Sequence, residues 1–136
     1  MDEDIRWKQR FQNFEKAFLQ LKDAVEKDSL TELEKTGLIR RFEFAMKISW
    51  KVMKDFLEEK GYPSDFSPKG IFHQAQRVGY ISYVQMLIDG IVLRSELSHD
   101  YSMQKHEEAI NEIRLKMFPV LEQLYNFFIQ ESGNDV

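Results

Sequence analysis

The sequence predicts an all-α fold, an antiparallel, up-and-down bundle of four long helices and one short one. Two observations carry this prediction. Large apolar residues recur at alternating spacings of three and four residues, which places them along one face of a helix. Eleven phenylalanines against six glycines and three prolines favour long packed elements over many short turns. A chain of 136 residues is long enough to bury a core of its own.

The first helix is predicted from one apolar stripe near the start of the chain. Its members are Trp7, Phe11, Phe14, Phe18, Leu21 and Val25. We expect this helix to end near Lys27, because Asp28 and Ser29 offer a new N-cap. Ser29 followed three residues later by Glu32 has the pattern of a capping box, which predicts the start of the second helix.

The second helix should run to about Lys60, and it carries two adjacent apolar seams. One seam is Leu38, Phe42, Ala45, Ser49, Val52 and Phe56, and the other is Ile39, Met46, Trp50, Met53 and Leu57. A helix with two seams contacts two neighbours, so it lies inside a bundle. Gly37 indicates either a break or a close helix contact. The opposite face is polar and consists of Arg40, Glu43, Lys47, Lys51, Lys54 and Glu58.

Turn and cap residues place the third and fourth helices. Gly61 ends the second helix, and Ser67 followed by Pro68 opens a short third helix that ends near Gly79. The fourth helix is predicted over about 82–97. Because residues 84–93 are apolar almost all round, we expect this helix to be the most buried element of the bundle.

The last helix follows the polar segment 98–102. Its inner stripe is Ile110, Ile113, Met117, Val120, Leu124 and Phe127. Pro119 should kink this helix, because proline lacks the backbone N–H donor. Residues expected deep inside the bundle are Trp50, Phe56, Leu87 and Val120. We expect one domain over residues 1–132 and a frayed tail over 133–136.

Composition limits the classes of function. The chain has no cysteine, which excludes disulfides and thiolate metal sites. A net charge of -4 argues against binding nucleic acid mainly through bulk electrostatics, although a local site for RNA or a nucleotide stays open. No apolar run reaches the roughly 18 residues that span a bilayer. The acidic start, Met1 to Asp4, is unlike a secretory signal, so we expect a cytoplasmic location.

One segment at the end of the predicted fourth helix concentrates polar chemistry. It contains Arg94, Ser95, Ser98, His99 and Tyr101. Burying such groups is costly unless they are paired, so they should lie at the end of the bundle or at an interface. A polar helix terminus with His99 near the C-terminal dipole is the simpler structural interpretation.

Helix geometry restricts how these side chains can meet. At about 100° per residue, Arg94 and His99 point roughly 140° apart on a continuous helix. Ser95 and His99 share a face, as do Arg94 and Ser98. Arg94 and His99 can therefore act on one atom only if the helix breaks before His99, or if two copies meet across a twofold axis.

Other polar and aromatic residues favour structural roles. The three histidines, His73, His99 and His106, are too scattered for a metal site, so neither a metal nor a cofactor is expected. The lysines of the second helix are better explained as a solvated face, with Glu43 pairing Lys47, than as a contact for RNA or an acidic partner. Core packing is likewise favoured over base stacking for Trp50 and Phe42. Phe44 lies off both seams and is a better candidate for an interface.

The polar segment also carries a recognisable pattern, Arg-x-x-x-x-His-x-Tyr, formed by Arg94, His99 and Tyr101. Three further blocks accompany it in order: residues 7–13, residues 37–57, and residues 67–81 with Ser67-Pro68-Lys69, Ala75 and Gly79-Tyr80-Ile81. Together these blocks resemble the HEPN superfamily over nearly the whole chain, specifically its HepT-like nucleotidyltransferase substrate-binding family. The motif arginine is usually followed by a polar residue such as asparagine. Here that position is Ser95, whose hydroxyl has less reach and fewer hydrogen-bond donors.

This resemblance implies a helical bundle that forms a homodimer and acts with a partner nucleotidyltransferase. It suggests a metal-independent endoribonuclease toxin with the transferase as its antitoxin. In that reading Arg94 and His99 are catalytic, and Ser95 and Ser98 are supporting polar residues. Tyr101 is the residue to which the partner would transfer AMP.

Two other classes of function remain open. The chain could be a non-catalytic subunit that binds nucleotide or substrate for the transferase, or a structural helical dimer that only retains the motif. Fold alone does not decide between these three.

Overall fold

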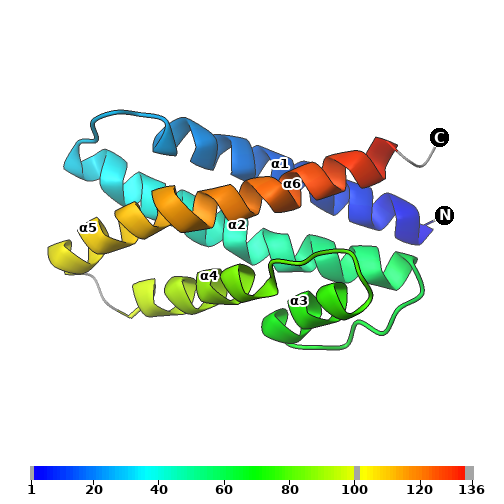
Figure 1. The fold of residues 1–136 in the computed structure, drawn as a ribbon. Helices are drawn as coiled ribbons and strands as arrows, with labels where there is room; N and C mark the ends of the chain where they lie inside the picture. Colours follow the sequence, from blue (N-terminus) through cyan, green and yellow to red (C-terminus); the bar gives the residue numbers. More distant parts are fainter. Residues whose placement is uncertain (1, 100–101, 134–136) are drawn as a thin grey trace.

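The computed structural model describes residues 2–99 and 102–133, and every regular element in this part of the chain is helical. The order is α1 (Asp2–Val25), α2 (Glu32–Glu59), α3 (Pro68–Arg77), α4 (Val84–Leu97), α5 (Met103–Glu112), the π-helical segment η1 (Ile113–Met117) and α6 (Phe118–Gly133). Figure 1 shows α5, η1 and α6 as one interrupted rod beside α1 and α2, with α4 and the short α3 along the other side of α2. The expected all-α bundle is confirmed. Gly133 belongs to α6, and the rest of the expected tail lies outside the described residues.

The N-terminus of α2 lies two residues later than the sequence predicts. Thr31, not Ser29, is the N-cap: its Oγ1 accepts from the Glu34 backbone N–H at 3.2 Å, and the Thr31 N–H donates to Glu34 Oε1 at 2.9 Å. Ser29 with Glu32 and Thr31 with Glu34 both have the three-residue spacing of a capping box, so the spacing alone does not choose between them. Leu30 packs against the core just ahead of the helix, which keeps it in the connection. α1 ends at Val25, two residues earlier than expected.

The α2–α3 connection follows the predicted chemistry. Gly61 after α2 has a φ of 84°, a left-handed conformation that favours glycine. Ser67 caps α3, because its Oγ accepts from the Gly70 N–H at 3.2 Å, and Pro68 is the first helical residue. Gly37 neither breaks α2 nor contacts another helix closely, since a Cβ added there would meet nothing within 4 Å.

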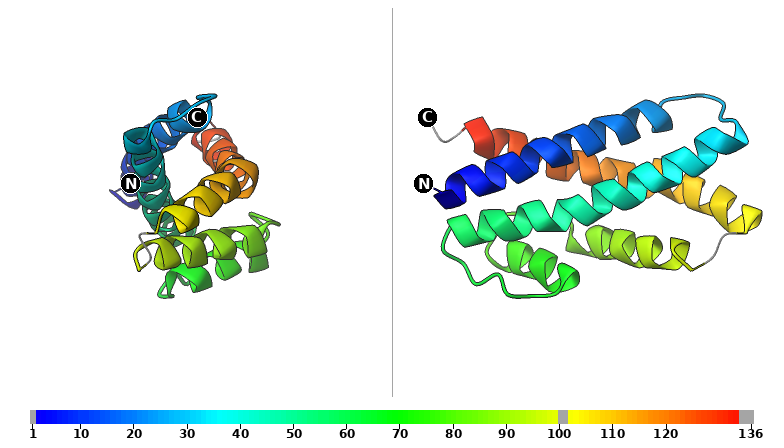
Figure 2. Two further views of the ribbon diagram at one scale, coloured as in Figure 1. Left: turned by 90° about the vertical axis from the view of Figure 1, so that its left-hand side faces the viewer. Right: turned by 180° about the vertical axis from the view of Figure 1, so that it is seen from behind.

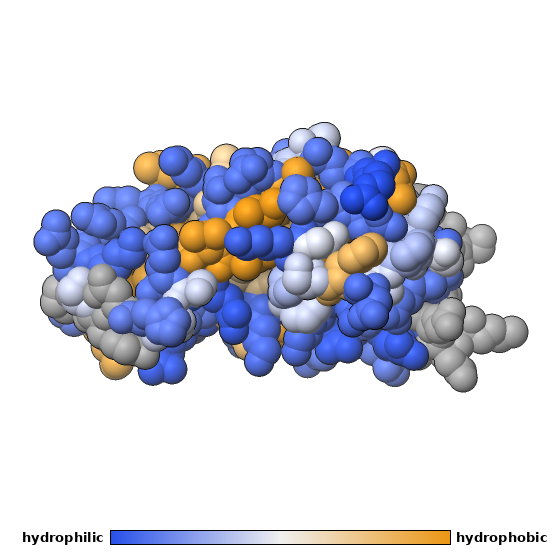
Figure 3. Space-filling model, turned by 90° about the horizontal axis from the view of Figure 1, so that it is seen from below, coloured by the Kyte–Doolittle hydropathy of each residue, from blue (hydrophilic) through white to orange (hydrophobic). Residues whose placement is uncertain are grey.

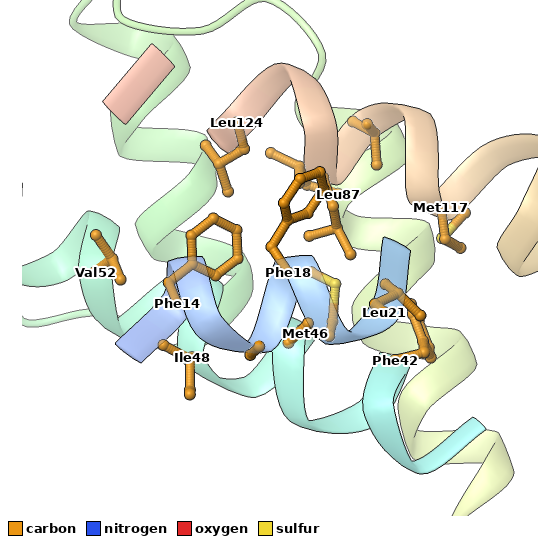
Figure 4. Close-up of a cluster of buried hydrophobic side chains, with 14 of the residues drawn as sticks. Phe14, Phe18, Leu21, Phe42, Met46, Ile48, Val52, Leu87, Met117 and Leu124 are labelled. Atoms are coloured by element: carbon orange, nitrogen blue, oxygen red, sulfur yellow. The ribbon is translucent and has the colours of Figure 1, made fainter. Parts of the chain in front are cut away.

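The core lies between α1, α2 and the α5–α6 rod. All six residues of the first α2 seam are fully buried, and so are Phe14, Phe18 and Leu21 of α1 to within about one per cent. Figure 4 shows Phe14 and Phe18 directed into the space shared with Leu87 of α4 and Leu124 of α6. The structure buries Phe56, Leu87 and Val120, as predicted. Trp50 is only half-buried, because it lies at the border between the buried and the exposed face of α2.

α4 is not the most buried element, contrary to the expectation from its composition. Only Val84, Leu87, Gly90, Leu93 and Leu97 are buried, whereas α2 contributes twelve buried residues. α4 packs with one side against α2, α3 and the α5–α6 rod, so its other side stays at the surface. Its apolar residues therefore exceed what the fold of a single chain can bury.

The last rod changes from α-helical to π-helical just before Pro119. α5 gives way to the π-helical turn Ile113–Met117, and the Phe118 N–H donates to the Ile113 carbonyl five residues earlier. α6 then begins at Phe118, so the proline occupies its first turn, where a missing N–H costs little. Beyond the turn, the fully buried ring is that of Phe128, while the expected Phe127 is half-buried.

Candidate functional site

Arg94 lies on α4 against the N-terminal half of α2. Its half-buried side chain lines a shallow hollow of ≈ 210 Å³ together with Arg40, Glu43 and Phe44. The Arg94 Nε is buried and has no hydrogen-bond partner within the described part of the chain. Leaving a charged donor unpaired is costly.

His99 lies on a different side of the same helix end. α4 stops at Leu97, and His99 follows in a turn in which its N–H donates to the Glu96 carbonyl at 3.1 Å. His99 is exposed and lines an open surface hollow with Ser95, Glu96 and Lys105.

An ion pair between Lys105 and Glu96 borders the hollow beside His99. Lys105 Nζ lies 3.2 Å from the Glu96 carboxylate. This hydrogen bond to Glu96 raises the pKa of Lys105 above its ordinary value. Lys105 thus stays cationic beside His99 at neutral pH.

Ser98 faces toward α2 rather than toward His99. It lines a hollow with Arg40, Glu43, Leu97 and the half-buried His106, besides Thr36 and Ile39. Its Oγ donates to the Ser95 carbonyl at 2.7 Å, which ties the side chain to the last turn of α4. His106, which the sequence left as an ordinary helix residue, is therefore part of this surface.

The structure separates the motif residues into two groups. Arg94 and Ser98 line hollows that share Arg40 and Glu43, whereas Ser95 and His99 share a third hollow. Among the hollows of the described residues given above, Arg94 and His99 line different ones, which agrees with the helical offset between them. Tyr101 lies outside the described residues.

The outward face of α4 joins the His99 hollow to an apolar stripe. Ile88, Val92, Ser95 and His99 follow at spacings of four, three and four, which places them on one side of the helix. Ile88 is half-buried, and 37% of Val92 is exposed. Figure 3, which looks at the face where α4 lies, shows hydrophobic residues gathered across the middle of this surface.

Metal binding and membrane crossing can both be examined on the described residues. Within residues 2–99 and 102–133, no three histidine, aspartate or glutamate side chains gather where they could hold a metal ion. In the same ranges, no helix combines the length and the apolar character needed to cross a bilayer.

Sequence reasoning missed the α2 side of the site. Arg40, Glu43 and Phe44 have the spacing of one helical face, but a spacing cannot show which helix that face will meet. Glu43 lines the hollows of Arg94 and Ser98, and no ion pair of the described side chains joins it to Lys47 as expected. Phe44 is 52% exposed, consistent with its position off both seams.

Comparisons with known proteins give the family. None of the curated proteins matches the sequence significantly. A crystal structure of a protein from Thermus thermophilus has the same fold, with a TM-score of 0.74 and 23% identity over 87% of this chain and 97% of that one. The family described as nucleotidyltransferase substrate binding protein like matches residues 9–130. This confirms the family that the motif blocks resemble. The chain belongs to the nucleotidyltransferase substrate-binding-like family.

Proposed function

We propose that this protein is the toxin subunit of a two-component cytoplasmic system, a metal-independent endoribonuclease that a partner nucleotidyltransferase restrains. The observation that carries the proposal is the Arg94 guanidinium, which borders an open hollow with its Nε buried and unpaired. A guanidinium with an unpaired N–H beside an open hollow suits a phosphate whose charge grows during cleavage. The family description supports the choice of partner.

The proposed chemistry uses two side chains and no metal. The ribose 2′-oxygen bonds to phosphorus and passes its proton to His99, while the bond between phosphorus and the 5′-oxygen breaks. The 5′-oxygen takes a proton from a solvent water, and His99 then gives its proton to the hydroxide that this leaves. The products are a 2′,3′-cyclic phosphate and a free 5′-hydroxyl. Arg94 binds the non-bridging oxygens as their charge develops, and Ser95 and Ser98 support the site as neutral hydrogen-bonding groups.

A second copy of the chain completes this site. Within one copy, Arg94 and His99 line different hollows, so one copy does not present both to one phosphate. The apolar stripe through Ile88 and Val92 leads directly to Ser95 and His99 on the exposed face of α4. Pairing of two such faces would bury the stripe and bring both copies of the motif together.

The activity is tested with the chain expressed alone and with purified protein on RNA. Arg94→Ala and His99→Ala should each reduce cleavage by at least about 10²-fold and abolish growth inhibition, with the melting temperature unchanged. His73→Ala, an exposed histidine on α3, is the matched control and should cut RNA normally. Chelator should have no effect. Wild-type protein that neither cuts RNA nor slows growth contradicts the proposal.

The composite site is tested by light scattering. Val92→Asp places a charge in the apolar stripe and should convert a dimer into a monomer at micromolar concentration, with loss of cleavage. Gln12→Asp, at an exposed position on α1 rather than on α4, controls for added charge. A wild-type protein that is monomeric, or a Val92→Asp dimer of unchanged mass, rules out pairing through this face.

A second candidate is a non-catalytic subunit that binds a nucleotide or substrate for the transferase. The separation of Arg94 from His99 in one copy favours it, because a binding subunit does not need both groups at one atom. Co-expression separates the two candidates. A chain that is inactive when expressed alone, and that co-purifies with the transferase when the two are co-expressed, supports the binding subunit.

A further inference from the structure

A second hollow lies at the other half of α2, away from the α4 motif. It measures ≈ 310 Å³ and opens between the N-terminal half of α1 and the C-terminal half of α2. Its lining consists of Arg6, Arg10, Trp50, Lys51, Lys54, Asp55 and Glu58. Four of these side chains are cationic and two are acidic.

The two carboxylates are already occupied. Asp55 is 6% exposed and accepts from Arg10 Nε at 2.8 Å, and Glu58 lies 3.2 Å from Arg6 Nη1. Glu58 is four residues from Lys54, a spacing at which it could pair with that lysine, but it is turned toward α1 instead.

Lys51 and Lys54 therefore carry positive charge that no carboxylate compensates within the described residues. Both are half-buried and line the hollow. In a chain with a net charge of -4, this is a local cationic site, and its charge favours an anionic ligand.

An aromatic ring lies among these cations. Trp50 is half-buried, with part of its indole packed against the core and the rest bordering the hollow. Lys51 Nζ lies 5.9 Å from the centroid of the Trp50 ring. A flat ring beside two unpaired lysines suits a ligand that has both a planar base and a phosphate.

The hollow and the Arg94 site lie along the same helix, α2. Arg40, Lys47, Lys51 and Lys54 follow at spacings of seven, four and three, which places them on one face of α2. Glu43 lies on this face between Arg40 and Lys47, so cations outnumber acids along it without forming an unbroken row. The right-hand view of Figure 2 looks on to α2, with α1 above it and α3 and α4 below. From Arg40, which lines the Arg94 hollow, to Lys54 the helix rises about 21 Å.

We propose that the Trp50 hollow binds single-stranded RNA, with a base stacked on Trp50 and phosphates held by Lys51 and Lys54. The row of cations along α2 then leads the strand toward Arg94. A strand explains the row better than a free nucleotide, which would need only one end of it. The proposal rests on the proposed function only in taking this strand to be the substrate of the Arg94 site.

Tryptophan fluorescence tests this binding selectively. The chain has two tryptophans, and Trp7 is fully buried, so quenching by an added ligand reports on Trp50. The probe is a six-nucleotide single-stranded oligoadenylate added to full-length protein carrying His99→Ala, which prevents cleavage. Oligoadenylate should quench the fluorescence with saturation, and AMP or inorganic phosphate should bind much more weakly.

Variants then separate stacking from charge. Trp50→Ala, followed by fluorescence anisotropy of labelled RNA, should weaken binding by roughly 5- to 100-fold. Lys51→Ala with Lys54→Ala should lower the slope of log affinity against log salt by about 1.4, since each phosphate contact contributes about 0.7. Lys69→Ala, an exposed lysine on α3 outside the hollow, should change neither quantity. Circular dichroism checks that each variant is folded.

Three results would overturn the proposal. They are an absence of quenching, unchanged affinity in the double lysine variant, and competition by an acidic peptide or AMP at the affinity of the hexamer. These experiments also distinguish failure of the proposed RNA site at Trp50 from failure of the proposed ribonuclease activity. Wild-type protein that cuts RNA with Trp50 unquenched removes only the Trp50 site. Wild-type protein that binds RNA through Trp50 without cutting it removes only the ribonuclease.

Discussion

Two apolar regions of this bundle are used in opposite ways. Where α1, α2 and α6 meet, Trp7, Phe56 and Phe128 are fully buried, with Trp7 5.1 Å from Phe56 and 5.9 Å from Phe128 between ring centroids. α4 is just as rich in apolar residues, yet Val92 is 37% exposed. The difference lies in the neighbours. Helices α1, α2 and α6 each pack against the other two, whereas α4 is covered on one side only. Apolar composition shows how much surface a helix needs to bury, not whether its own chain covers it.

Removing a ring from the aromatic region should have the largest effect. Phe56→Ala deletes a fully buried side chain that contacts Trp7, Tyr80 and Phe127 at 5.0 to 5.5 Å between centroids. We expect the free energy of unfolding to fall by about 3–5 kcal/mol. Phe44→Ala, on the exposed face of the same helix, should cost no more than about 0.5 kcal/mol. Urea denaturation measures both. Equal losses would show that the exposed face of α2 is packed as tightly as the core.

Substitutions at two glycines compare a closely packed position, Gly90 of α4, with an open one, Gly37 of α2. A Cβ at Gly90 of α4 would approach Met46 Sδ to 2.8 Å and Met117 Sδ to 3.2 Å, whereas one at Gly37 of α2 meets nothing. Gly90→Ala should therefore destabilise the fold by about 1–3 kcal/mol through overpacking. Gly37→Ala should stabilise it by roughly 0.5–1 kcal/mol through helix propensity.

Thermal unfolding measures the two glycine variants. A neutral Gly90→Ala would mean that the methionine side chains move aside at no cost. The inner side of α4 would then be as loosely packed as its outer side.

The smallest effects concern two tyrosines at alkaline pH. Burial raises the pKa of Tyr83, next to α4, to about 12. Burial and the hydrogen bond that its hydroxyl donates to Glu15 at 2.7 Å raise the pKa of Tyr125, in the aromatic region, to about 12. The unfolded chain ionises near 10, so both tyrosines favour the folded state below that pH. This contribution should be lost as the pH rises from about 10 to about 12.

Absorbance titration of the phenol groups follows this loss, and substitution separates the two causes. Glu15→Gln should bring the pKa of Tyr125 down and leave that of Tyr83 unchanged. If both values move, or neither does, the hydrogen bond to Glu15 is not what distinguishes the two regions.

The sequence predicted the parts of the fold that depend on local pattern. The α1 stripe from Trp7 to Leu21, the first seam of α2 and the Ser67-Pro68 start of α3 were all correct, because helical periodicity and caps act within a few residues. It failed where a second segment decides. Thr31 competed with Ser29 for the cap, and Trp50 lies at the edge of the core, where it borders the hollow between α1 and α2. For the site, the motif placed Arg94 and His99 at the end of α4, but only the packing showed Arg40 and Glu43 beside Arg94.

The π-helical turn at Ile113–Met117 has a consequence for variation in chain length. Such a turn holds one residue more than the α-helical turn it replaces. In an uninterrupted helix, an added residue would rotate everything after it by about 100° and point Leu124 and Phe128 away from the core. The turn absorbs the addition locally, and Leu115 within it is 76% exposed. Deleting Leu115 should therefore leave the register of α6 intact, and natural members of the family should differ in length by single residues at this position.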